Sequence, residues 1–519
     1  MSEKENFIKL VNDNYTFKGE SILLGGAILK NENLPGVFVN LPLKTMNRHG
    51  LIAGATGTGK TKTLQLIAEG LSSKSVPILM MDIKSDLSGI AKPGETNDKI
   101  IERHTKIGTP HTVAGFPVEF LTISNEKGSR LRATVSEFGP VLFSKMLELN
   151  DTQSGLVAMI FKYCDDKKLP LLDLKDFKKL LQYVSDEGKK EIESEYGKIS
   201  TSSTGTILRK VIELEQQNAD LFFGETSFEV EDLLKIDSEG KGIISMIRLT
   251  DIQNKPKLFS TFLLCLLVEI YNVYPEEGDL DQPKLVIFID EAHLLFKEAS
   301  KALLEQIETI IKLIRSKGVG IFFCTQNPTD IPESVLSQLG MKVQHALRVF
   351  TANDRKDLKL IAANYPESEF YKIEELLTSL GIGEAAVTVL NEKGNPTPLC
   401  ATLLCAPASR MDVLSDQEID EIVGKSKLTE KYNQVIDRES AYEILNSKLN
   451  SENNEQEVEK ETDSSSVKKV QEKSTVEKVL TSTTARQVGR TVARELTRGL
   501  LGVLGIGGST RRKKSSGWF

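Results

Sequence analysis

The stretch Gly54-Ala55-Thr56-Gly57-Thr58-Gly59-Lys60-Thr61 decides the fold of this 519-residue chain. It matches the pattern GxxxxGK[ST] over its full length, and it follows an apolar strand-like run, 51–53, and precedes an amphipathic helix-like run, 61–71. Its glycines let the backbone curl so that N–H groups and a helix N-terminus surround a polyphosphate. A glycine-rich turn that matches by accident is the alternative, and the two flanking runs count against it. The stretch therefore predicts a phosphate-binding loop.

Two side chains of this loop have separate roles in such a site. Lys60 would reach the β- and γ-phosphates of a nucleotide, and the hydroxyl of Thr61 would occupy a coordination position of Mg²⁺. We expect the nucleotide to contact Gly54, Ala55, Thr56, Gly57, Thr58, Gly59, Lys60, Thr61 and Thr63.

A second apolar run, 284–289, ends in Asp290 and Glu291. Ligands collect at the carboxyl ends of strands in an α/β sheet, so Asp290 is predicted to hold Mg²⁺. Glu291 points elsewhere because side chains alternate along a strand, and it is predicted to polarise the water that attacks the γ-phosphate. Adjacent acids after a strand can also cap a following helix, and the phosphate loop is what favours the catalytic interpretation.

Further candidates come from the next strand-like run and from two arginines. Gln326 follows the run 319–324, where its amide could detect the γ-phosphate, and a turn-forming role is the alternative. Arg315 ends the helix-like run 300–317, where a cation also suits the helix dipole. In a ring its guanidinium could reach the neighbour's nucleotide. Arg348 is a second candidate, and the sequence does not choose between action within one subunit and action across subunits.

Asp82 and Asp86 stand at the end of another central strand-like run. They either tune the magnesium region or only shape the loop, and the sequence favours neither interpretation. They are therefore left outside the predicted core of the site.

Strand-like and helix-like runs alternate around the phosphate loop, which predicts an α/β fold with a mostly parallel sheet covered on both faces. The runs 342–350, 385–390 and 398–405 are expected to complete the sheet edge.

Between residues 132 and 235 the pattern changes to helices alone, and after residue 450 the composition cannot bury enough surface to order itself. The predicted parts are a short N-terminal β extension (1–45), the first part of the nucleotide-binding core (46–130), an inserted helical subdomain (131–240), the second part of the core (241–425), a helical or disordered acidic linker (426–480) and a basic amphipathic tail (481–519).

Composition limits the class of protein. Apolar residues make up 39% of the chain and charged residues 27%, with 17 prolines, as in ordinary globular proteins. The longest apolar stretch, Phe262–Val268, is far shorter than the roughly 18 residues that span a bilayer, and Met1–Lys9 lacks the basic start and apolar run of a secretion signal. The five cysteines are scattered without a CxxC spacing, which favours buried free thiols over a disulfide or zinc framework. A cytoplasmic protein is expected.

The net charge of −7 conceals an asymmetry. Residues 481–519 contain eight Arg or Lys residues and one Glu, a local charge of +7, so the rest of the chain carries −14. Such a tail, if helical, can lie on an anionic membrane, hold DNA phosphates or dock in a partner's groove, and an unfolded solvated tail is the alternative. A cationic and an apolar stripe would lie on opposite sides of that helix: Arg486, Arg490, Arg494 and Arg498, and Val488, Val492, Leu496 and Leu500.

Five stretches together resemble the HerA/FtsK superfamily of P-loop ATPases, and the likeness is closest to the bacterial HerA-like DUF853 group of helicases. The resemblance spans residues 36–410 and implies a RecA-like core, hydrolysis of ATP with Mg²⁺, and assembly into a ring, often hexameric, that moves on double-stranded DNA. The stretches are GATGTGKT (54–61), DIKSDLSG (82–89), LVIFIDEAH (285–293), RSKGVGIFFCTQNP (315–328) and SQLGMKVQHALRVF (337–350).

The resemblance also implies a role for each candidate residue. HerA itself has a sizeable N-terminal β-barrel, whereas only a short segment precedes Gly54 here, which departs from the family pattern. Carried over motif by motif, the roles are nucleotide grip for Lys60 and Thr61, magnesium binding for Asp290, catalysis for Glu291, sensing for Gln326 and an inter-subunit finger for Arg315.

Two functions of different classes follow from these features. The first is an ATP-driven DNA translocase or helicase-like motor that works as a homo-oligomer on double-stranded DNA. The second is a nucleotide-gated assembly or remodelling ATPase that residues 481–519 tether to a membrane surface or a protein partner. Stimulation of ATP hydrolysis by duplex DNA would favour the first, and flotation with anionic vesicles that is lost without residues 481–519 would favour the second.

Overall fold

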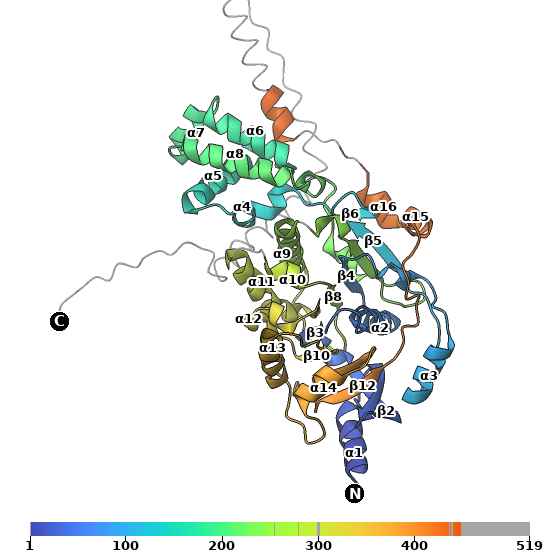
Figure 1. Ribbon diagram of the computed structural model, residues 1–519. Helices are drawn as coiled ribbons and strands as arrows, with labels where there is room; N and C mark the ends of the chain where they lie inside the picture. The colour runs from blue at the N-terminus through green and yellow to red at the C-terminus, as the bar shows by residue number, and fades with distance from the viewer. Residues whose placement is uncertain are drawn as a thin grey trace, which may run out of the picture.

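The computed structural model describes residues 2–447 except 254, 279, 298–300, 435 and 437–439. The predicted basic tail, 481–519, and the part of the predicted linker beyond residue 447 lie outside the described residues. A large mixed sheet runs through the described part, and helices lie on both of its faces (Figure 1). The predicted α/β class with a mostly parallel sheet is confirmed.

The sheet has 12 strands within the described residues, in the spatial order β2-β1-β12-β11-β10-β3-β9-β8-β4-β7-β5-β6. From β10 to β6 in this order every pairing is parallel. On the other side of β10, the pairings of β10 with β11, β11 with β12, β12 with β1 and β1 with β2 are antiparallel. The strands are β1 Ser21–Leu29, β2 Glu32–Pro42, β3 Gly50–Ala53, β4 Ile78–Asp82, β5 Val118–Thr122, β6 Ser129–Arg130, β7 Ile244–Arg248, β8 Leu285–Ile289, β9 Val319–Thr325, β10 Met341–Gln344, β11 Glu384–Thr388 and β12 Cys400–Leu404.

Strand β8 shows why the central strands read as continuous apolar runs. Leu285, Ile287 and Ile289 belong to the core on one face of the sheet, whereas Val286 and Phe288 belong to the core on the other. A strand that is buried on both faces has no side for polar residues, and each buried aliphatic side chain contributes roughly 1.5–3 kcal/mol. The sheet is therefore a rigid platform whose strand ends carry the site.

Helices α9 and α11 cover the face of the sheet that contains Leu285, Ile287 and Ile289, and helix α2 covers the opposite face. None of the helices within the described residues combines the length and the apolar character needed to cross a bilayer. The α-helices are α1 Glu3–Tyr15, α2 Lys60–Ser73, α3 Asp98–Ile107, α4 Val135–Met146, α5 Asp151–Lys167, α6 Leu174–Ser185, α7 Lys189–Tyr196, α8 Thr201–Glu215, α9 Pro256–Val273, α10 His293–Lys297, α11 Lys301–Ile314, α12 Glu333–Leu336, α13 Ala352–Ala363, α14 Ile373–Ser379, α15 Asp416–Lys425 and α16 Lys427–Tyr432.

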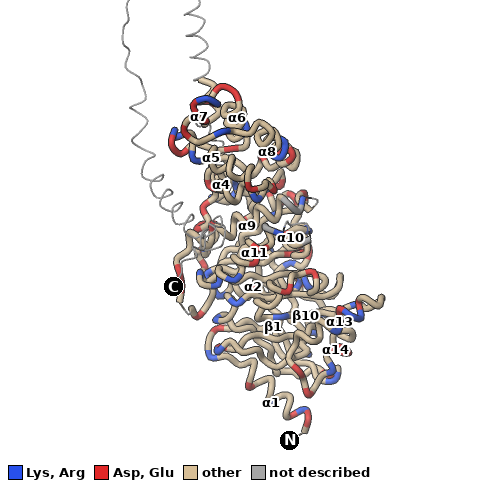
Figure 2. Tube along the Cα trace, turned by 90° about the vertical axis from the view of Figure 1, so that its left-hand side faces the viewer, with Lys and Arg blue, Asp and Glu red and all other residues tan. Residues whose placement is uncertain are grey.

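The stretch 135–234, which is described throughout, contains helices α4 to α8 and two short 3-10 helices. The helices predicted between residues 132 and 235 are thus present, and an isolated β-bridge between Ala133 and Phe223 departs from the expectation of helices alone. Figures 1 and 2 show α4 to α8 gathered at one end of the molecule, with α1 at the opposite end. The boundaries of the six predicted parts stay predictions.

The expectation for the strand-like run 342–350 is wrong in its second half. Strand β10 ends at Gln344, and beyond it the backbone turns towards the phosphate loop, where the carbonyl of Ala346 accepts a hydrogen bond from the N–H of Ala55 at 2.9 Å. The chain leaves the sheet at this point because its backbone groups find partners in the loop instead of in a neighbouring strand.

The N-terminal residues also differ from the expectation. Strand β12 pairs with β1, so the hairpin β1–β2 lies outside β10, β11 and β12, and these three strands do not form the sheet edge. Helix α1 has no counterpart among the predicted elements. It buries Phe7, Val11 and Tyr15, which recur every four residues on one face of the helix, in the same core as α2.

Candidate nucleotide-binding site

The phosphate loop connects β3 to α2 at the carboxyl edge of the parallel strands (Figure 1). The N–H of Gly54 donates to the carbonyl of Thr325, at the end of β9, at 3.3 Å. The N–H of Ala55 donates to Ala346, just beyond β10. Both neighbours of β3 therefore hold the start of the loop.

Two glycines give the loop its shape. Gly54 has a φ of +149°, and a Cβ atom there would lie 2.5 Å from the Cβ atom of His345. Gly59 has a φ of +113° and is the N-cap residue of α2, which has no side-chain cap. The first-turn N–H groups of α2 are thus free of a capping side chain, which suits an anion at this helix end.

The side chains of Lys60 and Thr63 form hydrogen bonds with other residues of the described structure. The Nζ atom of Lys60 donates to the carbonyl of Ala55 at 3.1 Å, and burial lowers the pKa of Lys60. The hydroxyl of Thr63 lies 2.8 Å from Nε2 of His345. Burial, followed by the charge of Lys60, lowers the pKa of His345 to about 4, so this ring is neutral at neutral pH.

The two acids after β8 lie near enough to the phosphate loop for their charges to act on Lys60. Asp290 is 5% exposed and Glu291 is 4% exposed, and the charges of both carboxylates act on Lys60. Burial, followed by the charges of Glu291 and Asp86, raises the pKa of Asp290 to about 6. The Oδ2 atom of Asp290 has no hydrogen-bond partner among the described residues. A buried carboxylate oxygen of this kind fits a cation.

Asp82, the last residue of β4, and Asp86, in the loop after it, lie beside this pair, because β4 is the neighbour of β8. The hydroxyl of Thr61 donates to Oδ2 of Asp86 at 3.4 Å, so Asp86 lies at the predicted magnesium position. Asp82 accepts hydrogen bonds from the N–H groups of Asp86 and Leu87 and thereby shapes the loop. Burial, then the charges of Asp86 and Asp290, raises the pKa of Asp82 to about 7.

Gln326 and the two arginines are placed differently. The hydroxyl of Thr56 in the phosphate loop donates to Oε1 of Gln326 at 3.3 Å, so the structure brings Gln326 to the loop. Arg315 precedes β9, and its charge acts on His49, which precedes β3. Arg315 therefore lies at the amino ends of the parallel strands, roughly 20 Å along the strand from the phosphate loop at their carboxyl ends. Arg348 is exposed and lies two residues beyond Ala346, on the edge that carries the loop.

Sequence reasoning missed Lys84, whose ammonium forms an ion pair with the Glu291 carboxylate. It also missed His345 as the support of Thr63. The sequence signal for Lys84 was a lysine two positions after Asp82, the acid that ends β4. This signal points to Glu291 only once β4 and β8 are known to be neighbours.

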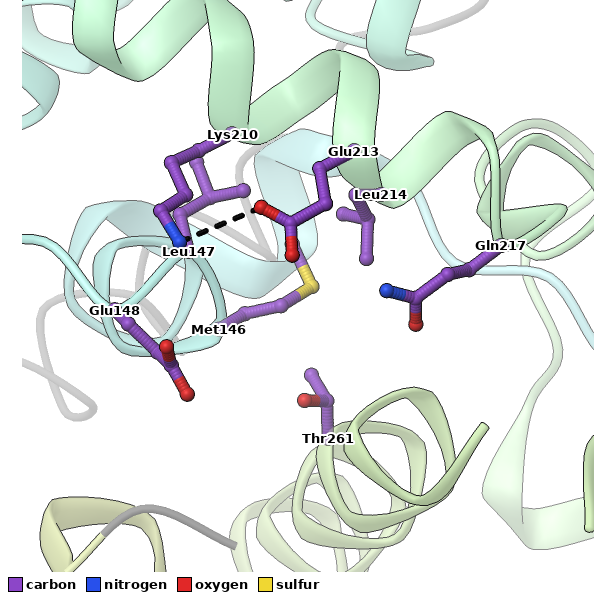
Figure 3. Close-up of a pocket in the computed structure, with 8 residues that line it drawn as sticks. All are labelled: Met146, Leu147, Glu148, Lys210, Glu213, Leu214, Gln217 and Thr261. Carbon is purple, nitrogen blue, oxygen red and sulfur yellow. Dashed lines mark hydrogen bonds and ion pairs between the residues drawn. The ribbon is translucent and has the colours of Figure 1, made fainter. Parts of the chain in front are cut away.

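A cavity elsewhere in the molecule does not belong to this site. It lies between the end of α4, helix α8 and helix α9, and Figure 3 shows Lys210 paired with Glu213 on its wall. Its volume of about 30 Å³ is far below the roughly 300 Å³ of a small-molecule site. It has room for ordered water and not for a nucleotide.

Comparison with known proteins gives related sequences. The family model described as "Helicase HerA-like C-terminal" matches residues 28–512. The "DNA double-strand break repair helicase HerA" of Sulfolobus acidocaldarius is 23% identical over 365 residues, 68% of this chain and 64% of that protein. The "DNA import protein CedB" of the same organism is 25% identical over 369 residues, 70% of this chain and 53% of that protein. The chain thus spans less than two thirds of the length of these relatives.

Solved structures share the fold. Two crystal forms of the bacterial conjugative coupling protein TrwBdeltaN70, the unbound monoclinic form and the trigonal form with sulphate, match with TM-scores of 0.50 and 0.51. Each is 14% identical in sequence, and each match covers 78% of this chain and 94% of that chain. This likeness agrees with the predicted P-loop core.

Proposed function

Because this chain belongs to the HerA-like family of P-loop ATPases, we propose that it hydrolyses ATP with Mg²⁺ and uses the cycle to move on double-stranded DNA as a ring-shaped homo-oligomer. The observation that carries the proposal is the position of Glu291. The negative charge of its carboxylate acts on Lys60 of the phosphate loop. This is so although β9 lies between β8, which precedes Glu291, and β3, which precedes the loop. A carboxylate beside the phosphate loop is what a hydrolase needs in addition to a nucleotide site.

The proposed nucleotide contacts come from the loop and its neighbours. The N–H groups of the loop and the ammonium of Lys60 would hold the phosphates. Thr61 and Asp290 would hold Mg²⁺, with Asp86 beside them, and the buried Oδ2 of Asp290 supports this assignment. The bound ion would supply positive charge against the charge on the transferring phosphoryl group.

The proposed hydrolytic step depends on two side chains. Glu291 would orient a water molecule towards the γ-phosphate and take its proton as the water oxygen bonds to the γ-phosphorus, while the bond from that phosphorus to the oxygen bridging to the β-phosphate breaks and ADP leaves. Gln326 would sense the γ-phosphate, and its hydrogen bond to Thr56 supports this role because it already links β9 to the loop. Glu291 follows β8 and Gln326 follows β9, and the neighbouring positions of these two strands support a shared role in one step.

DNA is proposed as the substrate of the motor because the relatives are named a DNA repair helicase and a DNA import protein. The test is an ATPase assay with duplex DNA, single-stranded DNA and RNA as effectors, on protein whose mass in solution is measured at the same time. We expect several-fold stimulation by duplex DNA that weakens steeply as salt rises, since phosphate contacts release counterions. Lys60→Ala is the control for contaminating ATPase.

The same experiment separates the second candidate. Hydrolysis that is indifferent to all three nucleic acids would contradict the DNA motor. Flotation with anionic vesicles that is lost on removal of residues 481–519 would then support the remodelling ATPase, whose tether is the basic tail of the sequence.

A further inference from the structure

The Glu291 carboxylate forms an ion pair with Lys84, which lies in the loop after β4, the strand next to β8. We propose that Lys84 is a positioning residue for hydrolysis, which keeps the Glu291 carboxylate in the nucleotide pocket and balances its charge there. This inference rests on the proposed function, because it assigns a partner to the side chain that would activate water.

The backbone on both sides of the contact is restrained. Glu291 has a φ of +46°, in the left-handed region that side-chain-bearing residues rarely adopt, at the turn directly after β8. The N–H of Ala292 donates to the carbonyl of Cys324 at 2.9 Å, which ties this turn to β9. On the other side, the Gln253 side chain donates to the carbonyl of Ile83 at 2.6 Å, next to Lys84. The contact therefore joins two anchored loops.

The carboxylate needs a cation at this place. The Glu291 side chain is 5% exposed, whereas the Lys84 side chain is 44% exposed, so the acid is the buried partner. The ammonium of Lys84 donates a hydrogen bond to Oε1 of Glu291. On the other side, Nδ1 of His293 lies 3.1 Å from Oε2 but without hydrogen-bond geometry. A buried charge that loses its partner is strongly unfavourable.

The surroundings of Lys84 keep it charged. Burial acts to lower its pKa, but the hydrogen bond and charge of Glu291, followed by the charges of Asp290 and Asp86, raise it. The site thus holds more carboxylates than ammonium groups, because the charges of Asp290 and Glu291 act on both Lys60 and Lys84, and the charge of Asp86 acts on Lys84. Lys60 belongs to the phosphates, which leaves Lys84 as the cation matched to Glu291.

The experiment compares Lys84→Met, which keeps the length and removes the charge, with Lys84→Arg, which keeps the charge. Lys74→Met is the matched control, because Lys74 forms an ion pair with Glu20 at the far end of α2. We expect Lys84→Met to lower kcat by about 100-fold with a KM for ATP within about twofold of the original protein, as a misplaced catalytic group does. Lys84→Arg should recover most of the rate, and Lys74→Met should change neither constant.

A second readout does not depend on turnover. Lys84→Met should lower the melting temperature, and the same change in a Glu291→Gln background should lower it less, because the neutral amide needs no cation. Equal losses in the two backgrounds would mean that the pair is not formed. Lys84→Gln serves as the neutral variant if Lys84→Met does not fold.

The outcomes separate this inference from the proposed function. If the unaltered protein hydrolyses ATP and Lys84→Met does so equally fast, the proposed function stands and the role of Lys84 is overturned. A loss of affinity for ATP relative to ADP would make Lys84 a phosphate ligand and would also overturn it, as would an arginine variant as slow as the methionine variant. If the unaltered protein does not hydrolyse ATP, the proposed function fails first and the positioning role fails with it.

Discussion

At the scale of single residues, the proposed function assigns to Glu291 the step that separates hydrolysis from nucleotide binding. Glu291→Gln keeps the size of the side chain but removes the proton acceptor, so we expect ATP binding to persist and kcat to fall by about 100-fold to 10,000-fold. Phosphate release and calorimetric nucleotide binding measure the two effects. Glu277→Gln is the control, since Glu277 pairs with Lys284 at the amino end of β8. Unchanged turnover would assign the proton acceptor to another carboxylate.

Asp82 is a second residue whose effect follows from its surroundings. Burial raises the pKa of Asp82 in the folded protein to about 7, above the ordinary aspartate value of 3.8, so the folded state binds the proton more tightly than the unfolded state. The contribution of Asp82 to stability is therefore highest at acid pH and is lost as pH rises towards 7.

Asp82→Asn removes this loss of stability. We expect the variant to be more stable than the original protein by about 2 kcal/mol at pH 8, less than the full value of the shift because the amide accepts weaker hydrogen bonds from the loop. At pH 4 the gain should vanish. Thermal unfolding without nucleotide at both pH values measures it, with the exposed Asp13→Asn as control. A gain of equal size at both pH values would show that the charge of Asp82 is not its source.

At the scale of elements, the phosphate loop offers a matched pair of glycines. In Gly54→Ala the new methyl group would meet the Cβ atom of His345 at 2.5 Å, whereas at Gly57, where φ is +76°, it would meet nothing within 4 Å. Gly57→Ala should thus cost only about 1–2 kcal/mol of backbone strain. Gly54→Ala should cost clearly more, because the loop must also move away from β10. Denaturant unfolding without nucleotide compares them, and equal losses would mean that His345 does not limit the loop.

The elements also show how far local patterns reach. The strand β8 was predicted because a strand buried on both faces has only apolar residues. Strand β5 was not predicted, since it carries Glu119, whose carboxylate accepts a hydrogen bond from Ser426 far along the chain. Site residues at the strand ends follow from the same apolar runs. The pairing of Lys84 with Glu291 does not, because it depends on β4 lying next to β8, and strand order is not contained in local periodicity.

At the scale of the whole molecule, the two arginine candidates lie at opposite ends of the parallel strands. Arg315 is at the amino ends, beside His49, and Arg348 is at the carboxyl ends, which carry the phosphate loop. Arg315 is too far from the loop of its own chain to touch a nucleotide there. If it stabilises the transition state at all, it does so in a neighbouring subunit, and this requires an oligomer.

A mixing experiment tests this requirement. Arg315→Ala leaves a chain with an intact phosphate loop and no finger, and Lys60→Ala leaves a chain with the finger and a damaged loop. Each variant alone should lose about 1,000-fold in turnover, which is the scale of an arginine finger. When the two are mixed, some interfaces join an intact loop to an intact Arg315, so turnover should exceed the sum of the separate rates.

Arg348→Ala mixed with Lys60→Ala is the matched comparison, with the mass in solution showing that both chains share one oligomer. Recovery with Arg315→Ala alone would assign the finger to Arg315, because only that arginine would then act across the interface. Recovery with Arg348→Ala alone would transfer the role to the arginine on the loop edge of the sheet. The absence of recovery in both mixed oligomers would contradict action across subunits, since each mixture contains every side chain that a complete site needs.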